Sequence, residues 1–154
     1  MRRKPSERSE RPALEGQKKP LVQQTPTVQT AGLMNYEAFN AFCETLPVTT
    51  HVVQWGGSHV WKVGGKVFAI GGWNDGEYAG ITFKVSEIAY EVLRDQAGLR
   101  PAPYLASRGM KWIQHYAEPG LSDEDLKDYL AESHRIVSLK LTKKLQRELG
   151  LNQD

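Results

Sequence analysis

The chain has a single cysteine, no long apolar run and no apolar segment behind its basic N-terminus. One cysteine, Cys43, excludes an internal disulfide framework and fits a reducing compartment. Its place on the apolar side of an expected helix favours a core residue over a nucleophile. No stretch approaches the roughly 18 apolar residues of a membrane-spanning helix, and a secretory signal would need an apolar region that is absent here. These features predict a cytoplasmic protein without a membrane partner.

Catalytic and metal-binding signatures are also missing. The sequence contains no Gly-x-Gly-x-x-Gly, Walker or Gly-x-Ser-x-Gly motif, and no nucleophile stands near a credible base. The four histidines, His51, His59, His115 and His134, lack the spacing of metal ligands. The acidic run at residues 123–125 resembles the first turn of a helix. We therefore expect a protein that is not an enzyme and that holds no metal or cofactor.

Charge is distributed unevenly along the chain. Residues 1–33 contain seven basic and three acidic residues and no aromatic residue, so we expect a disordered basic tail. Such a tail is typical of a non-specific nucleic-acid arm; the alternative, which we favour, is that translation starts at Met34. Residues 34–154 contain 13 basic and 15 acidic residues. This predicted domain is slightly acidic, which does not favour strong binding of a polyanion.

The segment from Ser58 to Trp73 organises the predicted fold. Gly64-Gly65 supplies the positive φ angles of a tight hairpin turn, and the residues on both sides alternate in character. This register places Val63 opposite Lys66 and Trp61 opposite Phe68. Because an isolated hairpin is marginally stable, other segments must cover its apolar face.

The rest of the domain mixes helices and strands without a βαβ repeat, which favours an α+β fold with helices packed on an antiparallel sheet. Residues 100–109 form a Pro-rich connection, and a helix after Ser86 should end at Gly98. We expect helices after the N-caps Asn35, Ser86, Ser122 and Thr142, further strands at Thr49–Trp55, Tyr78–Val85 and Met110–Tyr116, and core positions at Trp61, Phe68, Phe83 and Trp112.

Basic and aromatic residues are expected to gather on the sheet face away from the core. Arginine and lysine position phosphates, and aromatic rings stack on bases. The alternative is an ordinary solvated surface that covers the open face of the sheet. The candidate residues are Lys62, Lys66, Lys84, Arg100, Arg108 and Lys111, with Tyr104 and Trp73 beside them.

Several short motifs occur in a characteristic order over about three quarters of the chain. They are Asn35-Tyr36, Leu46-Pro47, the hairpin KVGGKVFA at residues 62–69, Thr82-Phe83-Lys84, Arg100-Pro101-Ala102-Pro103-Tyr104, Lys111-Trp112-Ile113, Leu121-Ser122-Asp123 and Ser133-His134. In this order they resemble the MmcQ/YjbR-like family of small bacterial domains. The resemblance implies a frataxin-like α+β fold and DNA binding through a double-wing arrangement of hairpins. The wings would be the turn at Gly64-Gly65 and the loops near Asp75 and Arg108.

Two departures limit what the resemblance implies. Many family members carry a histidine shortly after the Arg-Pro pair, where this chain has residues 104–107, YLAS. Iron binding in frataxin-like proteins uses an acidic first helix, and here that helix has only Glu37 and Glu44. We therefore expect that this chain lacks any function carried by that histidine in other members, and that it has no iron site.

The leading hypothesis is a non-enzymatic DNA-binding domain that contacts mainly the phosphate backbone. The candidate lysines and arginines would contact phosphates, while Tyr104 and Trp73 would stack or wedge. A second hypothesis is an adaptor that binds a protein or small ligand on the open sheet face and the loop at residues 104–108. The slightly acidic domain motivates this alternative.

Overall fold

A computed structural model describes residues 34–72, 80–103, 105 and 109–153. The predicted disorder of residues 1–33 lies outside this range. In chain order the elements are α1 (Tyr36–Thr45), β1 (Thr49–Gln54), β2 (Ser58–Val63), β3 (Lys66–Gly71), β4 (Ile81–Lys84), α2 (Glu87–Leu93), β5 (Leu99–Pro101), β6 (Trp112–His115), α3 (Asp123–Leu139) and α4 (Lys143–Leu149).

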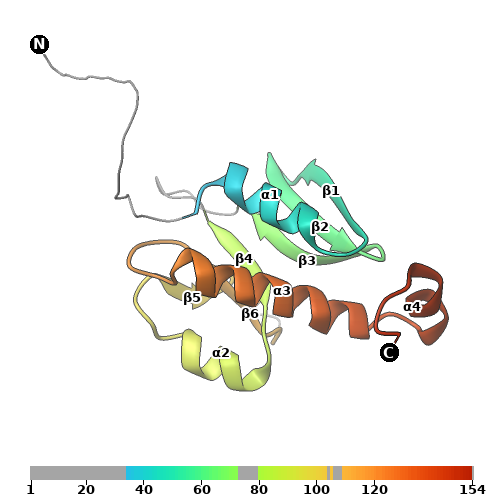
Figure 1. Cartoon of the computed structure of the whole chain (residues 1–154). Helices are drawn as coiled ribbons and strands as arrows, with labels where there is room; N and C mark the ends of the chain where they lie inside the picture. Colours follow the sequence, from blue (N-terminus) through green and yellow to red (C-terminus); the bar gives the residue numbers. More distant parts are fainter. Residues whose placement is uncertain (1–33, 73–79, 104, 106–108, 154) are drawn as a thin grey trace, which may run out of the picture. The chain divides into compact units, whose positions relative to one another are not determined.

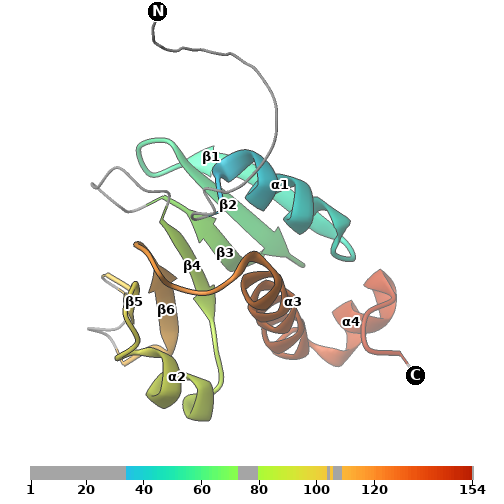
Figure 2. The same cartoon turned by 60° about the vertical axis from the view of Figure 1, so that its left-hand side comes forward.

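The strands form one antiparallel sheet in the order β1-β2-β3-β4-β6-β5. Helices α1 and α3 lie side by side against the sheet, α2 packs near β5 and β6, and α4 follows α3 (Figures 1 and 2). The α+β fold predicted from the sequence is therefore confirmed.

Each described helix begins at the N-cap that the sequence predicts. The side chain of Asn35 accepts a hydrogen bond from the N–H of Ala38 at 2.8 Å. The side chains of Ser86, Ser122 and Thr142 accept equivalent bonds three residues ahead. A side-chain oxygen there satisfies a backbone donor that has no partner inside the helix, which fixes where the helix starts.

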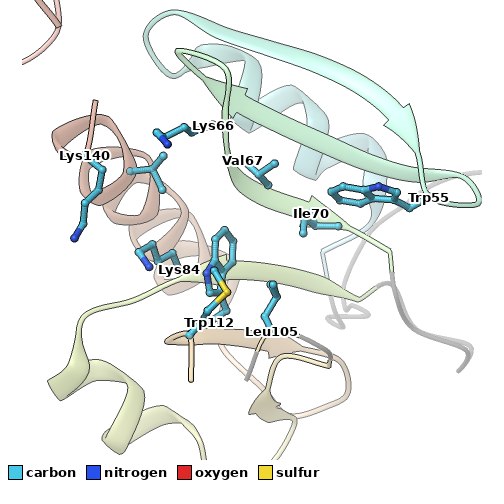
Figure 3. A pocket seen from close by; sticks show the side chains of 10 residues that line it. Trp55, Lys66, Val67, Ile70, Lys84, Leu105, Trp112 and Lys140 are labelled. Carbon is cyan, nitrogen blue, oxygen red and sulfur yellow. The ribbon is translucent and has the colours of Figure 1, made fainter. Parts of the chain in front are cut away.

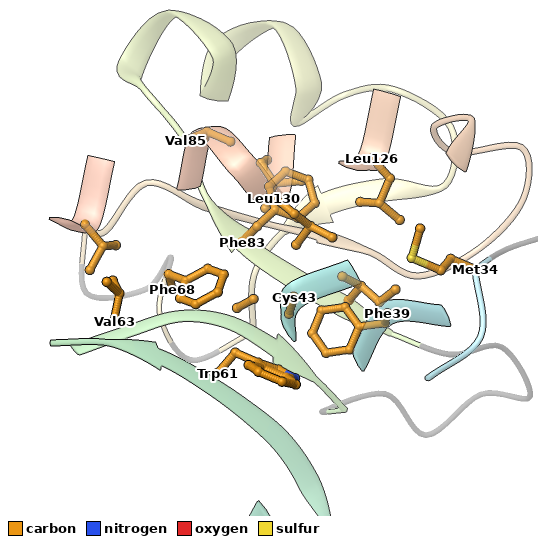
Figure 4. Packing of buried hydrophobic residues seen from close by; sticks show 14 of the residues in the cluster. Met34, Phe39, Cys43, Trp61, Val63, Phe68, Phe83, Val85, Leu126 and Leu130 are labelled. Carbon is orange, nitrogen blue, oxygen red and sulfur yellow. The ribbon is translucent and has the colours of Figure 1, made fainter. Parts of the chain in front are cut away.

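The core lies between the sheet and helices α1 and α3 (Figure 4). Phe39, Phe68, Phe83 and Leu130 have no exposed surface. Trp61 is also buried, and its indole Nε1–H donates to Asn40 Oδ1 at 2.8 Å, so its polar atom is satisfied. Cys43 is fully buried, which raises the pKa of its thiol.

The predicted hairpin register is correct only near the turn. Val63 lies opposite Lys66, but Trp61 pairs with Ala69 instead of Phe68 because the register shifts between Trp61 and Lys62. One extra residue on β3 makes a bulge. As a result Phe68 and Ala69 both reach the core, which strict alternation would forbid.

Two further boundaries differ from the prediction. Helix α2 ends at Leu93 rather than at Gly98. Gly98 sits instead in a tight turn with φ of +88°, where an added Cβ would lie 2.2 Å from the Ala117 carbonyl oxygen. The expected Pro-rich connection begins with an edge strand, β5, that pairs with β6. Pro101 is tolerated there because an edge strand can leave one side unpaired.

The sheet face away from α1 and α3 is less open than the sequence suggests. Thr82, which alternates along β4 with the core residues Ile81 and Phe83, is fully buried there, as are its pairing partners Ile70 and Gln114. Trp112 is buried as predicted, but it pairs with Lys84 and lies outside the helix-covered core cluster. This second face therefore carries its own apolar centre.

Candidate anion-binding site

Strands β3 and β4 separate at the β3 bulge. Their pairing covers Gly71 to Ala69 on β3 and stops at Ala69 opposite Phe83. Beyond that point the hydroxyl of Ser133, on α3, donates to the Phe68 carbonyl at 2.6 Å and accepts from the Lys84 N–H at 2.9 Å. A side chain thus satisfies the backbone groups that the separating strands leave unpaired.

A pocket of about 480 Å³ borders this separation (Figure 3). That volume lies within the range of about 300–1,000 Å³ common to small-molecule sites. Most of its lining is apolar. The lining residues are Trp55, Lys66, Val67, Ile70, Lys84, Leu105, Met110, Trp112, Val137 and Lys140.

Three separate elements bring lysines to one end of this pocket: Lys66 from the start of β3, Lys84 from the end of β4, and Lys140 from the C-cap of α3. Their approach depends on a close contact between the β2–β3 turn and the junction of α3 and α4. A Cβ added at Gly64 would lie 2.5 Å from Leu141 Cδ1, so any larger residue would force Leu141 to move.

These lysines have no acidic partner among the residues that the structure describes. The ion pairs found there are Glu132 with Arg135 and Lys144 with Glu148. Partial burial lowers the pKa of Lys84, and the like charge of Lys140 lowers it further. The Lys84 ammonium also lies 5.7 Å from the centre of the Trp112 ring, a cation–π distance. An anion at this end would relieve the repulsion between the lysines.

Buried polar atoms without partners lie on the same face. Within the described part of the chain, neither Trp112 Nε1 nor Thr82 Oγ1 has a hydrogen-bond partner, and both atoms are shielded from solvent. An unpaired buried donor usually costs about 1–3 kcal/mol. The charged and N–H groups that line the pocket are donors, so the chemistry offered there suits an acceptor.

The structure brings only part of the predicted site together. Lys66 and Lys84 line the pocket, whereas Lys62 lies half-buried opposite Val67 and does not line it. Trp73, Tyr104 and Arg108, and with them the wing loops near Asp75 and Arg108, lie outside the described residues.

The other two predicted cations are held elsewhere. Arg100 Nε donates to Gln114 Oε1 at 2.8 Å, and the guanidinium lies 4.3 Å from the centre of the Tyr116 ring. Lys111 Nζ lies 4.7 Å from the centre of the Tyr90 ring. Both side chains therefore have local partners on the domain, and their role as phosphate contacts stays a prediction.

Most of the pocket residues were not predicted to belong to a site, Lys140 and Trp55 among them. Lys140 reads in the sequence as one of several solvated lysines on the last helix, and Trp55 reads as the end of a strand. Trp55 instead lies in the β1–β2 turn with a φ of +54° and is half-exposed. A bulky residue in the left-handed region is uncommon, and no local sequence pattern predicts this conformation of Trp55.

The histidines offer little to a metal. Across residues 34–72, 80–103, 105 and 109–153, no three His, Cys, Asp or Glu side chains are grouped so that they could hold an ion. Two of the histidines do lie close together, with His51 Nε2 and His59 Nδ1 3.2 Å apart.

Within the same ranges, no helix has the length and hydropathy needed to cross a membrane.

Comparisons with known proteins identify the family. A comparison with curated proteins found no match. The crystal structure of the Deinococcus radiodurans protein DR2400, which carries the domain DUF419, is similar with a TM-score of 0.66 and 22% identity, over 75% of this chain and 88% of that one. At this identity the likeness shows the fold alone. The family model YjbR matches residues 44–136, more than half of the chain. The chain therefore belongs to the YjbR family.

Proposed function

We propose that this YjbR domain is a non-enzymatic DNA-binding domain that contacts the phosphate backbone. The observation that supports the proposal is the convergence of Lys66, Lys84 and Lys140 without an acidic partner among the described residues. Lysines that face no carboxylate are available to replace the counterions of a phosphate chain. A cytoplasmic location belongs to the same proposal, supported by the lone buried thiol of Cys43.

The cationic surface extends beyond the pocket onto the next helix. Lys140 is exposed, and Lys143 and Lys144 follow it in the first turn of α4, also exposed. Lys144 lies 4.0 Å from Glu148, and both side chains are more than half exposed, so that ion pair is weak and easily exchanged for a phosphate. Lys62 lies one strand away from this group and would contact a neighbouring phosphate.

The expected affinity is low and depends strongly on salt. Residues 34–154 carry slightly more acidic than basic residues, and three lysines converge. Each neutralised phosphate contributes about −0.9 to the slope of log K against log salt, so the three pocket lysines alone predict a slope of about −3, and further contacts would make it steeper. Because backbone contacts carry no sequence information, we expect little preference among duplexes.

Fluorescence anisotropy with a labelled DNA duplex across a salt series tests this proposal on the full chain. The double variant Lys66→Gln/Lys140→Gln should reduce the slope by about two, because two phosphate contacts are removed. A second full-length variant, in which the seven basic residues of positions 1–33 are replaced by glutamine, separates the contribution of that segment. Lys127→Gln is the matched control, since it removes a lysine near the start of α3 that lies over Phe42 instead.

Two outcomes would refute the assignment. Unchanged affinity and slope in Lys66→Gln/Lys140→Gln would exclude these lysines as the DNA site. Complete loss of binding when only residues 1–33 are neutralised would assign DNA binding to that segment and leave the domain another role.

A second candidate function is the binding of a small ligand. The observation that favours it is the pocket itself. Contacts to a DNA backbone need only a flat, solvated surface, whereas a concave, mostly apolar pocket is typical of small-ligand sites.

A further inference from the structure

The pocket between β3, β4 and α3 is polarised along its length (Figure 3). Lys66, Lys84 and Lys140 lie toward one end, and Trp55, Ile70 and Leu105 lie toward the other. Trp112 lies between the two groups, and the centre of its ring is 5.7 Å from the Lys84 ammonium. The two ends therefore offer different chemistry to one occupant.

We infer that this pocket binds a small amphipathic organic anion, whose carboxylate lies among Lys66, Lys84 and Lys140 and whose apolar body lies against Trp55, Ile70 and Trp112. The proposed DNA contacts use the same lysines but not the apolar end of the pocket, because a phosphate backbone needs only the lysines. An organic acid needs the apolar end as well.

Charge complementarity identifies the headgroup. The side chains at the cationic end can donate hydrogen bonds but cannot accept them, and no carboxylate among the described residues neutralises them. A carboxylate accepts charge-assisted bonds from several donors at once, and such bonds are stronger than those between neutral groups. Partial burial and Lys140 lower the pKa of Lys84, and an anion bound beside it would raise that pKa.

The apolar end identifies the body of the ligand. The lining there comes from two indoles and from aliphatic side chains, and it contributes little hydrogen bonding. A nucleobase would leave the donors and acceptors of its edges unpaired against such a wall, which is costly. A phenyl or alkyl group loses nothing there and gains from contact with the Trp55 and Trp112 rings.

The test uses 4-phenylbutyrate as the probe and the full chain labelled with ¹⁵N. The four tryptophans give four indole N–H signals, which single Trp→Phe variants assign. We expect 4-phenylbutyrate to shift the signals of Trp55 and Trp112 and to leave that of Trp61, whose N–H is held by Asn40, in place. Two control compounds are 4-phenylbutyramide, which is neutral, and acetate, which is an anion without the apolar group. Each should bind at least about tenfold more weakly than 4-phenylbutyrate.

Two variants connect the binding to the pocket. Lys140→Gln, at an exposed position, should lower the affinity for 4-phenylbutyrate by about tenfold, whereas Lys127→Gln should leave that affinity unchanged. Val67→Phe keeps every lysine and fills the space between the two ends. It should abolish binding of 4-phenylbutyrate while retaining the DNA affinity of the wild type, so the two proposals can fail independently.

Several results would overturn the inference. Equal affinity for the acid and its amide would remove the role of the lysines. Shifts confined to Trp61 or Trp73, or binding of 4-phenylbutyrate that survives both Val67→Phe and Lys140→Gln, would place the ligand elsewhere. Absence of any indole shift at millimolar 4-phenylbutyrate would show that the pocket does not accept this class of ligand.

Discussion

Ser133 accepts a hydrogen bond from the backbone N–H of Lys84 at 2.9 Å, and its hydroxyl donates to the Phe68 carbonyl at 2.6 Å. This side chain therefore replaces the ladder between β3 and β4 where the strands separate. The pocket borders the same separation, and Lys84 lines it. The backbone of a pocket residue is thus held by a buried serine that does not itself line the pocket.

Ser133→Ala should destabilise the domain by about 2–6 kcal/mol, because two backbone groups lose their partner at about 1–3 kcal/mol each. Urea unfolding measures the change. Ser138→Ala is the matched control on the same helix: its hydroxyl donates to the carbonyl of Arg135 and accepts from Asn152 Nδ2, which also donates to Gln146. No backbone N–H loses its partner there, so we expect a loss of about 1 kcal/mol. Equal urea midpoints for the two variants would contradict the bridging role.

Gly64→Ala should destabilise the domain more than Gly65→Ala does. Both glycines have positive φ, so both variants bear backbone strain, but only at Gly64 would the new Cβ meet Leu141, at 2.5 Å. We expect an additional loss of about 1–3 kcal/mol from this overpacking.

A double-mutant cycle with Leu141→Ala isolates that contact. Trimming Leu141 makes room for the methyl group, so the two substitutions together should cost less than the sum of their separate effects. Urea unfolding of the four proteins gives the coupling energy. Strict additivity would mean that the hairpin turn does not press on the junction of α3 and α4.

Local features of this fold could be predicted from the sequence. Asn35, Ser86, Ser122 and Thr142 act as N-caps because a cap needs only the residue and the three that follow. The hairpin turn at Gly64-Gly65 is equally local, since it depends on two positive φ angles. The α+β class followed from the order of these elements, and the motif order identified the family.

The errors arose where distant segments decide. The bulge at Phe68 could not be read from alternation, because it is held by Ser133, which lies 65 residues away in the chain. Likewise Lys140 joins Lys66 only through the contact of Gly64 with Leu141. The local partner of Arg100, Tyr116, becomes apparent only in the folded sheet.

Lys140→Gln should raise the pKa of Lys84. The variant removes a like charge, so the protonated form of Lys84 becomes more favourable. Burial, which is the larger cause, persists, so the pKa should stay below the usual value of 10.5. NMR titration of lysines labelled with ¹³C at the ε carbon follows the group directly. Lys127→Gln serves as the control and should leave the Lys84 titration unchanged; an equal response to both variants would refute specific coupling.

The domain should lose stability below about pH 6.5 because of two buried histidines. Burial lowers the pKa of His134 and of His115 from the usual 6.5. Below that pH the unfolded chain takes up protons that the folded state resists, so the free energy of unfolding falls as the pH falls toward the folded-state pKa values. Above pH 6.5 neither histidine contributes to a slope.

His134→Gln should reduce this acid loss. His134 Nε2 donates to the Pro47 carbonyl at 2.7 Å, and a glutamine amide can donate there without titrating. Urea unfolding of both proteins at pH 7.5, 6.5 and 5.5 gives the comparison. Between pH 7.5 and 6.5 the two stabilities should run nearly parallel. From pH 6.5 to 5.5 the wild type should lose up to about 1 kcal/mol more, because one histidine of the unfolded chain goes from half to nearly full protonation. Identical acid slopes would show that His134 is protonated as readily in the folded state as in the unfolded chain.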